Sequence, residues 1–192
     1  MSKYLVVGLG NIGIDYAGTR HNIGFDVADA LAGKHEGTFT PGRYADVCDI
    51  KWRGKRLIII KPTTFMNLSG KAVKYWVDKE GVPLPQTLVI LDEIAIPLER
   101  IRLRPSGSDG GHNGLKSIQA ALQTDQYPRL RFGIGNDYPK GGQADYVLAP
   151  WTPAELPLVK LKVKKCVEVI ESFVIMGIER TMNEANKLVF SV

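Results

Sequence analysis

Short apolar runs alternate with segments of helical periodicity along this chain. The apolar runs are four or five residues long and rich in large aliphatic side chains, which predicts buried strands. We expect these strands at 4–7, 87–91 and 130–134. Apolar residues that recur every three or four positions predict amphipathic helices. We expect these helices at 25–31, 68–77 and 115–122.

Other strands introduce antiparallel pairing. Residues 44–52 and 56–60 form a predicted hairpin around Arg53-Gly54-Lys55, and residues 100–104 alternate charged and apolar side chains as an edge strand does. Strands that alternate with helices indicate an α/β fold. The sequence therefore predicts a mixed, mostly parallel central sheet flanked by helices.

A long helix is predicted near the end of the chain. Thr152 and Glu155 have the spacing of a capping box, Pro153 suits the first helical turn, and Gly177 follows the last periodic residue. No repeat or long linker interrupts the pattern. A chain of 192 residues has the usual size of one domain, so we expect a single domain over 1–192.

Composition narrows the class of protein. Two distant cysteines, Cys48 and Cys166, have neither zinc nor CxxC spacing, which argues against a disulfide framework. The chain shows neither a signal peptide nor an apolar run of about 20 residues, so we expect a cytoplasmic protein. The formal net charge of +5 suits either solubility or an anionic partner.

A glycine motif follows the first strand. Gly8-Leu9-Gly10-Asn11-Ile12-Gly13 matches the dinucleotide-binding fingerprint, but that fingerprint needs a helix at the third glycine, and 14–20 reads as a loop. The alternative is a sharp turn that brings Asn11 to the carboxyl end of the strand. The same loop carries His21, which is either a solvated side chain or a proton acceptor.

Two further loops each lead into a predicted helix. In 61–70, Asn67 either caps the helix or offers its amide to a ligand. Phe65 and Met66 beside it are either core residues or an apolar wall. The glycine-rich stretch 106–112 is either a mobile connection or a gate before Asn113.

Asp92 ends a predicted strand, where it is either a turn residue or a carboxylate that orients a histidine. The chain contains neither a GxSxG elbow nor an HExxH motif, so nothing supports a serine nucleophile, a catalytic metal or another cofactor. One histidine, one carboxylate and several amides suit the activation of water by a general base, with the amides holding an ester substrate.

Taken together, four segments resemble the bacterial-type peptidyl-tRNA hydrolases. These segments are GLGNIGIDYAGTRHNIGF, KPTTFMNLSG, LDE and GGHNGLKSI, and RLRFGIG follows them. The resemblance runs from Tyr4 to about Asn186. It implies a monomeric α/β enzyme, with no cofactor or obligate protein partner and no membrane association. The implied reaction hydrolyses the ester between a peptide and the 3′ end of tRNA.

The resemblance also implies residue roles. His21 is similar to the general base and Asp92 to its orienting partner. Asn67 and Asn113 match the amides that hold the peptidyl group, and Asn11 matches a residue that distinguishes blocked from free aminoacyl groups. The positions similar to those that contact tRNA are Tyr16, Phe65 and Met66 around the CCA end, and Arg104 and Arg131 near the 5′ phosphate of the acceptor stem.

Arginines at alternate positions support an anionic partner. Residues two apart on a strand share a face, so Arg102 with Arg104 and Arg129 with Arg131 predict a phosphate clamp, which Lys116 could extend. The alternative is solvated edge-strand charge.

The chain departs from the family pattern at two positions. Ile12 replaces the usual proline, and Ala95 replaces an acidic residue. Both departures affect loop geometry and leave the chemical groups in place.

Two rival functions remain. A non-catalytic RNA-binding protein is one, since such proteins occur on this fold, but it need not keep the histidine and amides. A nucleotide-dependent oxidoreductase is the other, and it rests on the glycine motif alone.

Overall fold

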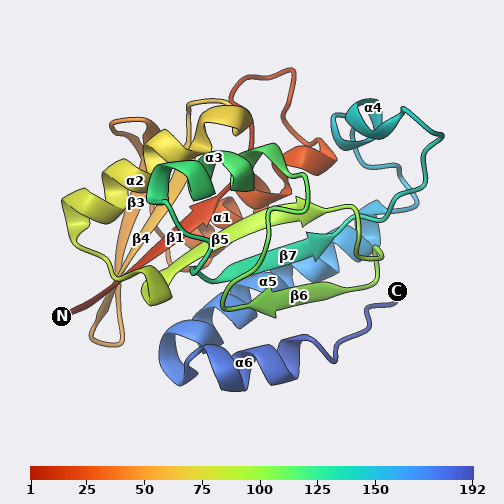
Figure 1. The fold of residues 1–192 in the computed structure, drawn as a ribbon. Coiled ribbons are helices and arrows are strands. Elements are labelled where there is room, and N and C mark those ends of the chain that lie inside the picture. The colour runs from red at the N-terminus through yellow and green to blue at the C-terminus, as the bar shows by residue number, and fades with distance from the viewer.

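The computed structural model describes all 192 residues and contains one seven-stranded sheet in the order β2-β3-β4-β1-β5-β7-β6 (Figure 1). The strands are β1 Ser2–Gly8, β2 Thr40–Pro41, β3 Ala45–Trp52, β4 Lys55–Pro62, β5 Thr87–Glu93, β6 Ile101–Arg104 and β7 Arg129–Gly133.

The four central strands are parallel, because β1 pairs in parallel with both β4 and β5, and β5 pairs in parallel with β7. The β3–β4 hairpin and the edge strand β6 add antiparallel pairs. This confirms the predicted mixed sheet. After β1, the chain first forms β2, β3 and β4 on one side of that strand and then β5, β6 and β7 on the other side. The strand order therefore reverses between β1 and β5. Ligands of open α/β sheets bind beside such a point, at the carboxyl ends of the strands.

Helices cover both faces of the sheet (Figure 1). They are α1 Ile23–Lys34, α2 Ser69–Glu80, α3 Asn113–Leu122, α4 Gln143–Val147, α5 Leu156–Met176 and α6 Ile178–Ala185. Helices α1, α5 and α6 contribute to a cluster of 28 buried residues on one face, and α2 and α3 to a cluster of 16 on the other. Three 3-10 turns also occur: η1 Arg20–Asn22, η2 Met66–Leu68 and η3 Leu84–Gln86.

The local signals in the sequence correspond to the observed element ends. Gly81 closes α2 in the left-handed conformation, and Gly177 follows α5. Thr152 and Glu155 form the capping box: the Glu155 amide donates to Thr152 Oγ1 (3.3 Å), and Glu155 Oε1 accepts from the Thr152 amide (2.9 Å). Regular helix begins only at Leu156, one turn later than predicted. Helix α4 was not predicted.

None of these helices is both long enough and apolar enough to cross a bilayer. Both cysteines are buried and unpaired.

Candidate functional site

A cleft of about 520 Å³ opens at the carboxyl ends of β1 and β5. Its walls come from the loops after these strands, from η2 and the start of α3, and from α4. The polar side chains that line it include Asn11, His21, Asn67, Asp92, His112 and Asn113. Six residues from four separate segments of the chain therefore share one cavity.

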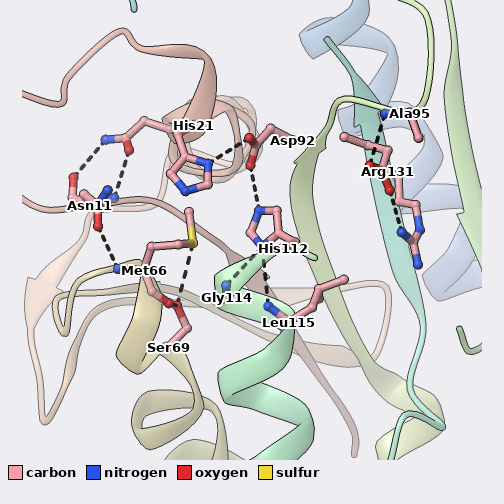
Figure 2. Close-up of polar contacts among 12 residues, drawn as sticks. Asn11, His21, Met66, Ser69, Asp92, Ala95, His112, Gly114, Leu115 and Arg131 are labelled. Atoms are coloured by element: carbon pink, nitrogen blue, oxygen red, sulfur yellow. Dashed lines mark hydrogen bonds and ion pairs between the residues drawn. The ribbon is translucent and has the colours of Figure 1, made fainter. Parts of the chain in front are cut away.

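Asp92 lies at the centre of the polar network (Figure 2). Its Oδ2 lies 2.8 Å from Nδ1 of His21, and its Oδ1 lies 2.8 Å from Nε2 of His112. The carboxylate is 3 % exposed, whereas the two imidazoles are 13 % and 10 % exposed. Each carboxylate oxygen thus holds a different ring.

The partners of the rings fix where their protons lie. Nδ1 of His112 accepts from the backbone amides of Gly114 (3.1 Å) and Leu115 (3.4 Å), so His112 carries its proton on Nε2 and donates it to Asp92. His21 likewise donates from Nδ1, because a carboxylate only accepts. The lone pair of neutral His21 is therefore on Nε2, the nitrogen that a general base would use.

Asp92 is ionised across the neutral range. Burial alone would raise its pKa, but the electrostatic interactions and hydrogen bonds with His112, and then with His21, outweigh burial and lower the pKa to about 2. An ionised carboxylate therefore faces the Nδ1–H of His21 and holds the ring in this tautomer.

His21, Asp92 and His112 also form the one group that could hold a metal ion, with ligand atoms within 4.8 Å of one another. The backbone amides that donate to His112 place a proton on its Nε2, between the ring and Asp92. Hydrogen bonds therefore account for the contacts within this group.

Asn11 is anchored on three sides (Figure 2). Its backbone amide and carbonyl exchange two 2.8 Å hydrogen bonds with the side chain of Asn22. Its Oδ1 accepts from the Met66 amide at 2.7 Å. Because a backbone amide can only donate, this contact identifies Oδ1, and Nδ2 is left as a donor at the cleft wall.

Asn67 and Asn113 are exposed, and neither side chain makes a hydrogen bond within the protein. Neither caps a helix: Leu68 precedes α2 without a side-chain cap, and His112 provides the cap of α3. Two unengaged carboxamides therefore line the cleft, each able to donate and to accept.

Close backbone contacts set the width of the site. A Cβ at Gly24 would lie 2.4 Å from the Leu9 amide nitrogen and 2.6 Å from the Ile90 carbonyl oxygen. A Cβ at Gly70 would lie 2.2 Å from the Ser117 carbonyl oxygen. The first contact packs α1 against β1 and β5, and the second packs α2 against α3. Only glycine allows both approaches.

The two apolar residues before Asn67 differ in burial. Met66 is buried in the α2–α3 core, although it also touches the cleft. Phe65 is 46 % exposed and adopts a left-handed backbone (φ 64°), with its ring edge-to-face with Tyr16 at 6.4 Å.

Comparison with known proteins identifies the family. The sequence matches the family described as "Peptidyl-tRNA hydrolase" over residues 5–191. The chain belongs to the peptidyl-tRNA hydrolase family. These proteins are ester hydrolases that act on peptidyl-tRNA, and the chain is an enzyme of this kind.

Relatives match along almost their full length. Peptidyl-tRNA hydrolases of Phocaeicola vulgatus and Parabacteroides distasonis are each 51 % identical, over 96 % of this chain and 99 % and 98 % of theirs. The crystal structure of peptidyl-tRNA hydrolase from Acinetobacter baumannii has 30 % identity and a TM-score of 0.92, covering 97 % of this chain and 95 % of that one. The fold is thus shared as well as the sequence.

The predicted phosphate clamp of the enzyme needs a correction. Its four arginines do share one face of β6 and β7. Arg129, however, is 1 % exposed and donates to the carbonyls of Asp125 and Tyr127. A buried guanidinium cannot contact a phosphate. Sequence periodicity gives the face of a strand but does not show that a loop covers it.

Arg131 contacts the glycine-rich loop 106–112, which carries the proposed gate. Its Nη1 pairs with Glu93 Oε1 at 2.6 Å, and its Nη2 donates to the Ser108 carbonyl at 3.0 Å. Arg102 and Arg104 are exposed, as is Lys116 on α3. Fewer cations of the predicted clamp are therefore accessible than the sequence suggested: Arg102, Arg104 and Lys116 are exposed, whereas Arg129 is buried.

His112 is the residue that sequence reasoning missed. In the sequence it stands at the end of the glycine-rich stretch 106–112, whereas in the structure it binds Asp92 and caps α3. A histidine directly before a predicted helix could have indicated the cap. Its contact with Asp92 requires the fold.

Proposed function

We propose that this enzyme cleaves peptidyl-tRNA by general-base hydrolysis, with His21 as the base. The observation that carries this proposal is the pairing of His21 Nδ1 with Asp92, which leaves Nε2 with a lone pair on a side chain that lines the cleft. An imidazole in this tautomer accepts a proton from water while the carboxylate stabilises the resulting cation.

The reaction then follows in two steps. The water oxygen bonds to the ester carbonyl carbon as its proton passes to Nε2 of His21, giving a tetrahedral oxyanion. The bond from that carbon to the 3′ oxygen of the ribose breaks next, and the imidazolium returns its proton to the leaving oxygen. The products are a peptide with a free carboxyl group and a tRNA with a free 3′ hydroxyl.

The carboxamides hold the acyl part. Asn67 and Asn113 have unengaged amides at the cleft, so they donate to the peptidyl carbonyl and to the developing oxyanion. Asn11 offers a fixed Nδ2 donor, which suits the carbonyl of an N-blocked group, whereas a free ammonium would meet a second donor there. This arrangement favours peptidyl over aminoacyl esters.

Arg104, with Arg131 beside the gate loop, is proposed to contact the 5′ phosphate region of the acceptor stem, and Tyr16, Phe65 and Met66 the CCA end. The enzyme is proposed to act as a monomer, and translation in the cytoplasm is its proposed setting. Sedimentation of the purified enzyme tests the monomer.

The decisive experiment compares His21→Ala with His35→Ala. His35 is also a half-buried histidine paired with a carboxylate, Glu171 (3.0 Å), but it lies outside the cleft. On N-acetyl-aminoacyl-tRNA, His21→Ala should lower kcat by about 10²–10⁴-fold, the usual contribution of a general base. His35→Ala should keep near-normal kcat.

Near-normal turnover by a folded His21→Ala enzyme would refute the assignment of the base. Free aminoacyl-tRNA, assayed beside the blocked substrate, tests Asn11. The preference for the blocked substrate should shrink in Asn11→Ala, and an unchanged preference would remove Asn11 from this role.

A further inference from the structure

A second hollow adjoins the catalytic cleft. It has a volume of about 800 Å³ and lies between α2, the second half of α3 and the loop before β3. Asn67 lines both the cleft and this hollow, so the two are continuous. We call it the Tyr44–Tyr75 groove, after the two tyrosines in its wall.

The groove is cationic. Arg43, Lys71 and Lys74 line it, all three are exposed, and its lining contains no carboxylate. Neither Arg43 nor Lys71 has an ion-pair partner. Lys74 contacts Asp78, but both side chains are more than half exposed, and such a pair contributes little. All three cations are available to an anionic ligand.

Two aromatic rings lie among these cations. Tyr44 and Tyr75 meet edge-to-face at 5.8 Å, and the Arg43 guanidinium lies 5.2 Å and 5.3 Å from their centroids. A cationic groove with exposed aromatic rings is the arrangement that binds single-stranded nucleic acid, because bases stack on the rings while the cations follow the phosphates.

The backbone at Tyr44 supports a role for its ring. Tyr44 has φ 63°, a left-handed conformation that glycine or asparagine adopts at less cost than a bulky side chain. The strand pairing continues around it, since the Thr63 amide donates to the Tyr44 carbonyl at 2.8 Å. The Trp76 indole donates to the carbonyl of Arg43 next to it. Strain of this kind, held in place by its surroundings, is typical of ligand contacts.

The nature of the substrate decides between RNA and peptide. The peptides on different substrate molecules vary in sequence, and a cationic wall would discriminate against basic ones. The unpaired 3′ end of tRNA carries the same phosphates and bases at its terminus in every substrate. A fixed set of cations and aromatic rings therefore suits the 3′ end of the tRNA better than it suits the peptide.

The path of such a strand is also available. The hollow that contains Lys116 and the groove share Ala120 on α3. Lys116 lies on the flank of α3 toward the gate loop, as its neighbour Asp109 indicates. Because Asp109 and Asp125 also line the hollow around Lys116, the cationic stretch of this path is the groove itself.

We propose that the Tyr44–Tyr75 groove binds the single-stranded 3′ end of the tRNA just before the esterified nucleotide, an inference that rests on the proposed function for its choice of substrate. Arg43, Lys71 and Lys74 contact the phosphates, and the two tyrosines stack with bases.

The test uses RNA without an ester, so that binding is separate from catalysis. Two RNA hairpins copy the acceptor stem, one with the four unpaired 3′ nucleotides and one blunt, and their Kd values are measured by fluorescence anisotropy against salt. The wild-type enzyme should bind the hairpin with the overhang more tightly. Tyr75→Ala should weaken that binding by about 5- to 150-fold and leave the blunt hairpin unaffected.

The cations should appear in the salt dependence. Arg43→Ala and Lys74→Ala should each reduce the slope of log K against log salt by about 0.7 for the overhang hairpin. Arg180→Ala, which removes an exposed arginine from α6, is the matched control and should not reduce it. Tyr75→Phe keeps the ring and should bind as the wild type does.

Two results would overturn the proposal. One is an equal loss of affinity in Arg180→Ala and Arg43→Ala, which would indicate general charge. The other is unchanged RNA binding in the Tyr75 and Lys74 variants together with a raised KM for substrates with acidic peptides, which would assign the groove to peptide. Neither result bears on His21, because the hairpins carry no ester.

Discussion

At the scale of single residues, the two histidines around Asp92 differ in one respect. Their rings lie 5.2 Å apart, and both donate to the same carboxylate. Both nitrogens of His112 are occupied, one by Asp92 and the other by the amides that begin α3. Only His21 keeps a nitrogen available for water. His112 is thus a positioning residue, which holds Asp92 and does not touch the reacting atoms.

This distinction predicts different effects on stability and on rate. His112→Ala removes the cap of α3 and should lower the free energy of unfolding by about 1–2 kcal/mol. His112→Asn restores a good capping side chain but is too short to keep the contact with Asp92. It should recover the stability and still lower kcat by about 10–100-fold, the cost of one hydrogen bond to a charged group.

Urea unfolding and single-turnover kinetics of both variants check this prediction. Full recovery of kcat in His112→Asn would mean that His112 acts only as a helix cap.

At the scale of elements, the start of α5 is connected to the catalytic loop. Glu155 Oε1 accepts from the Thr152 amide in the capping box and also from Arg20 Nη2 at 2.7 Å. Arg20 precedes His21, is 5 % exposed, and donates to the carbonyls of Tyr146 and Pro150. Its guanidinium lies 4.2 Å from the Tyr146 ring centroid. The Glu155–Arg20 pair thus joins the start of α5 to η1, and Arg20 extends the connection to α4.

Glu155→Gln should therefore destabilise the enzyme more than an ordinary surface change. Breaking a largely buried ion pair leaves a charge without compensation, and the remaining contacts of Arg20 offset part of that cost. We expect a loss of about 2–3 kcal/mol. The matched control is Glu168→Gln, which removes an exposed pair with Lys165 on the same helix and should change stability by less than about 0.5 kcal/mol. Equal effects in denaturant unfolding would contradict this reading.

Sequence periodicity was sufficient for elements with a clear pattern and local stop signals. The hairpin turn at Arg53-Gly54 and the left-handed Gly81 are both encoded within a few residues. Helix α4 was missed because it has five residues, follows two glycines and buries none of its side chains. A segment without a buried face leaves no periodic signal.

The candidate site could be assembled from the sequence only in part. The strand-end position of Asp92 and the loop position of His21 were readable, because strand ends and glycine loops are local features. The burial of Arg129 and the second partner of Asp92 depend on segments far away in the chain, so no local pattern carries them.

At the scale of the whole molecule, ionisable groups in the interior lie away from the cleft as well as in it. Burial lowers the pKa of Lys162 on α5 to about 7, while its Nζ donates to the carbonyls of Leu98 and Gly133. Burial, with a smaller contribution from Asp29, raises the pKa of Asp26 on α1 to about 6, although Lys61 opposes this shift. In the folded state, burial disfavours the charged form of both side chains.

Asp26 should make stability depend on pH in the mildly acidic range. Its folded pKa lies above the ordinary value of 3.8, so the folded state binds more protons between about pH 4 and pH 6. The associated stability is present below about pH 4 and is lost as the pH rises through 6. Asp26→Asn removes this loss and should raise the free energy of unfolding at pH 7 by about 1–3 kcal/mol.

Urea unfolding of the wild-type enzyme and of Asp26→Asn at pH 4 and pH 7 checks this prediction. The two enzymes should be close in stability at pH 4. A gain from Asp26→Asn that is the same at both pH values would show that the carboxylate is not the cause.

The glycine contacts beneath the cleft have a consequence for how this enzyme can change. Gly24 follows His21 by three residues and touches the strand that carries Asp92. Gly70 follows Asn67 by three residues and touches the helix that begins with Asn113. The absence of a side chain at Gly24 and Gly70 thus sets the spacing between His21 and Asp92 and between Asn67 and Asn113. Even alanine at either position would push the two backbones apart and shift the groups above them, without removing any reactive atom.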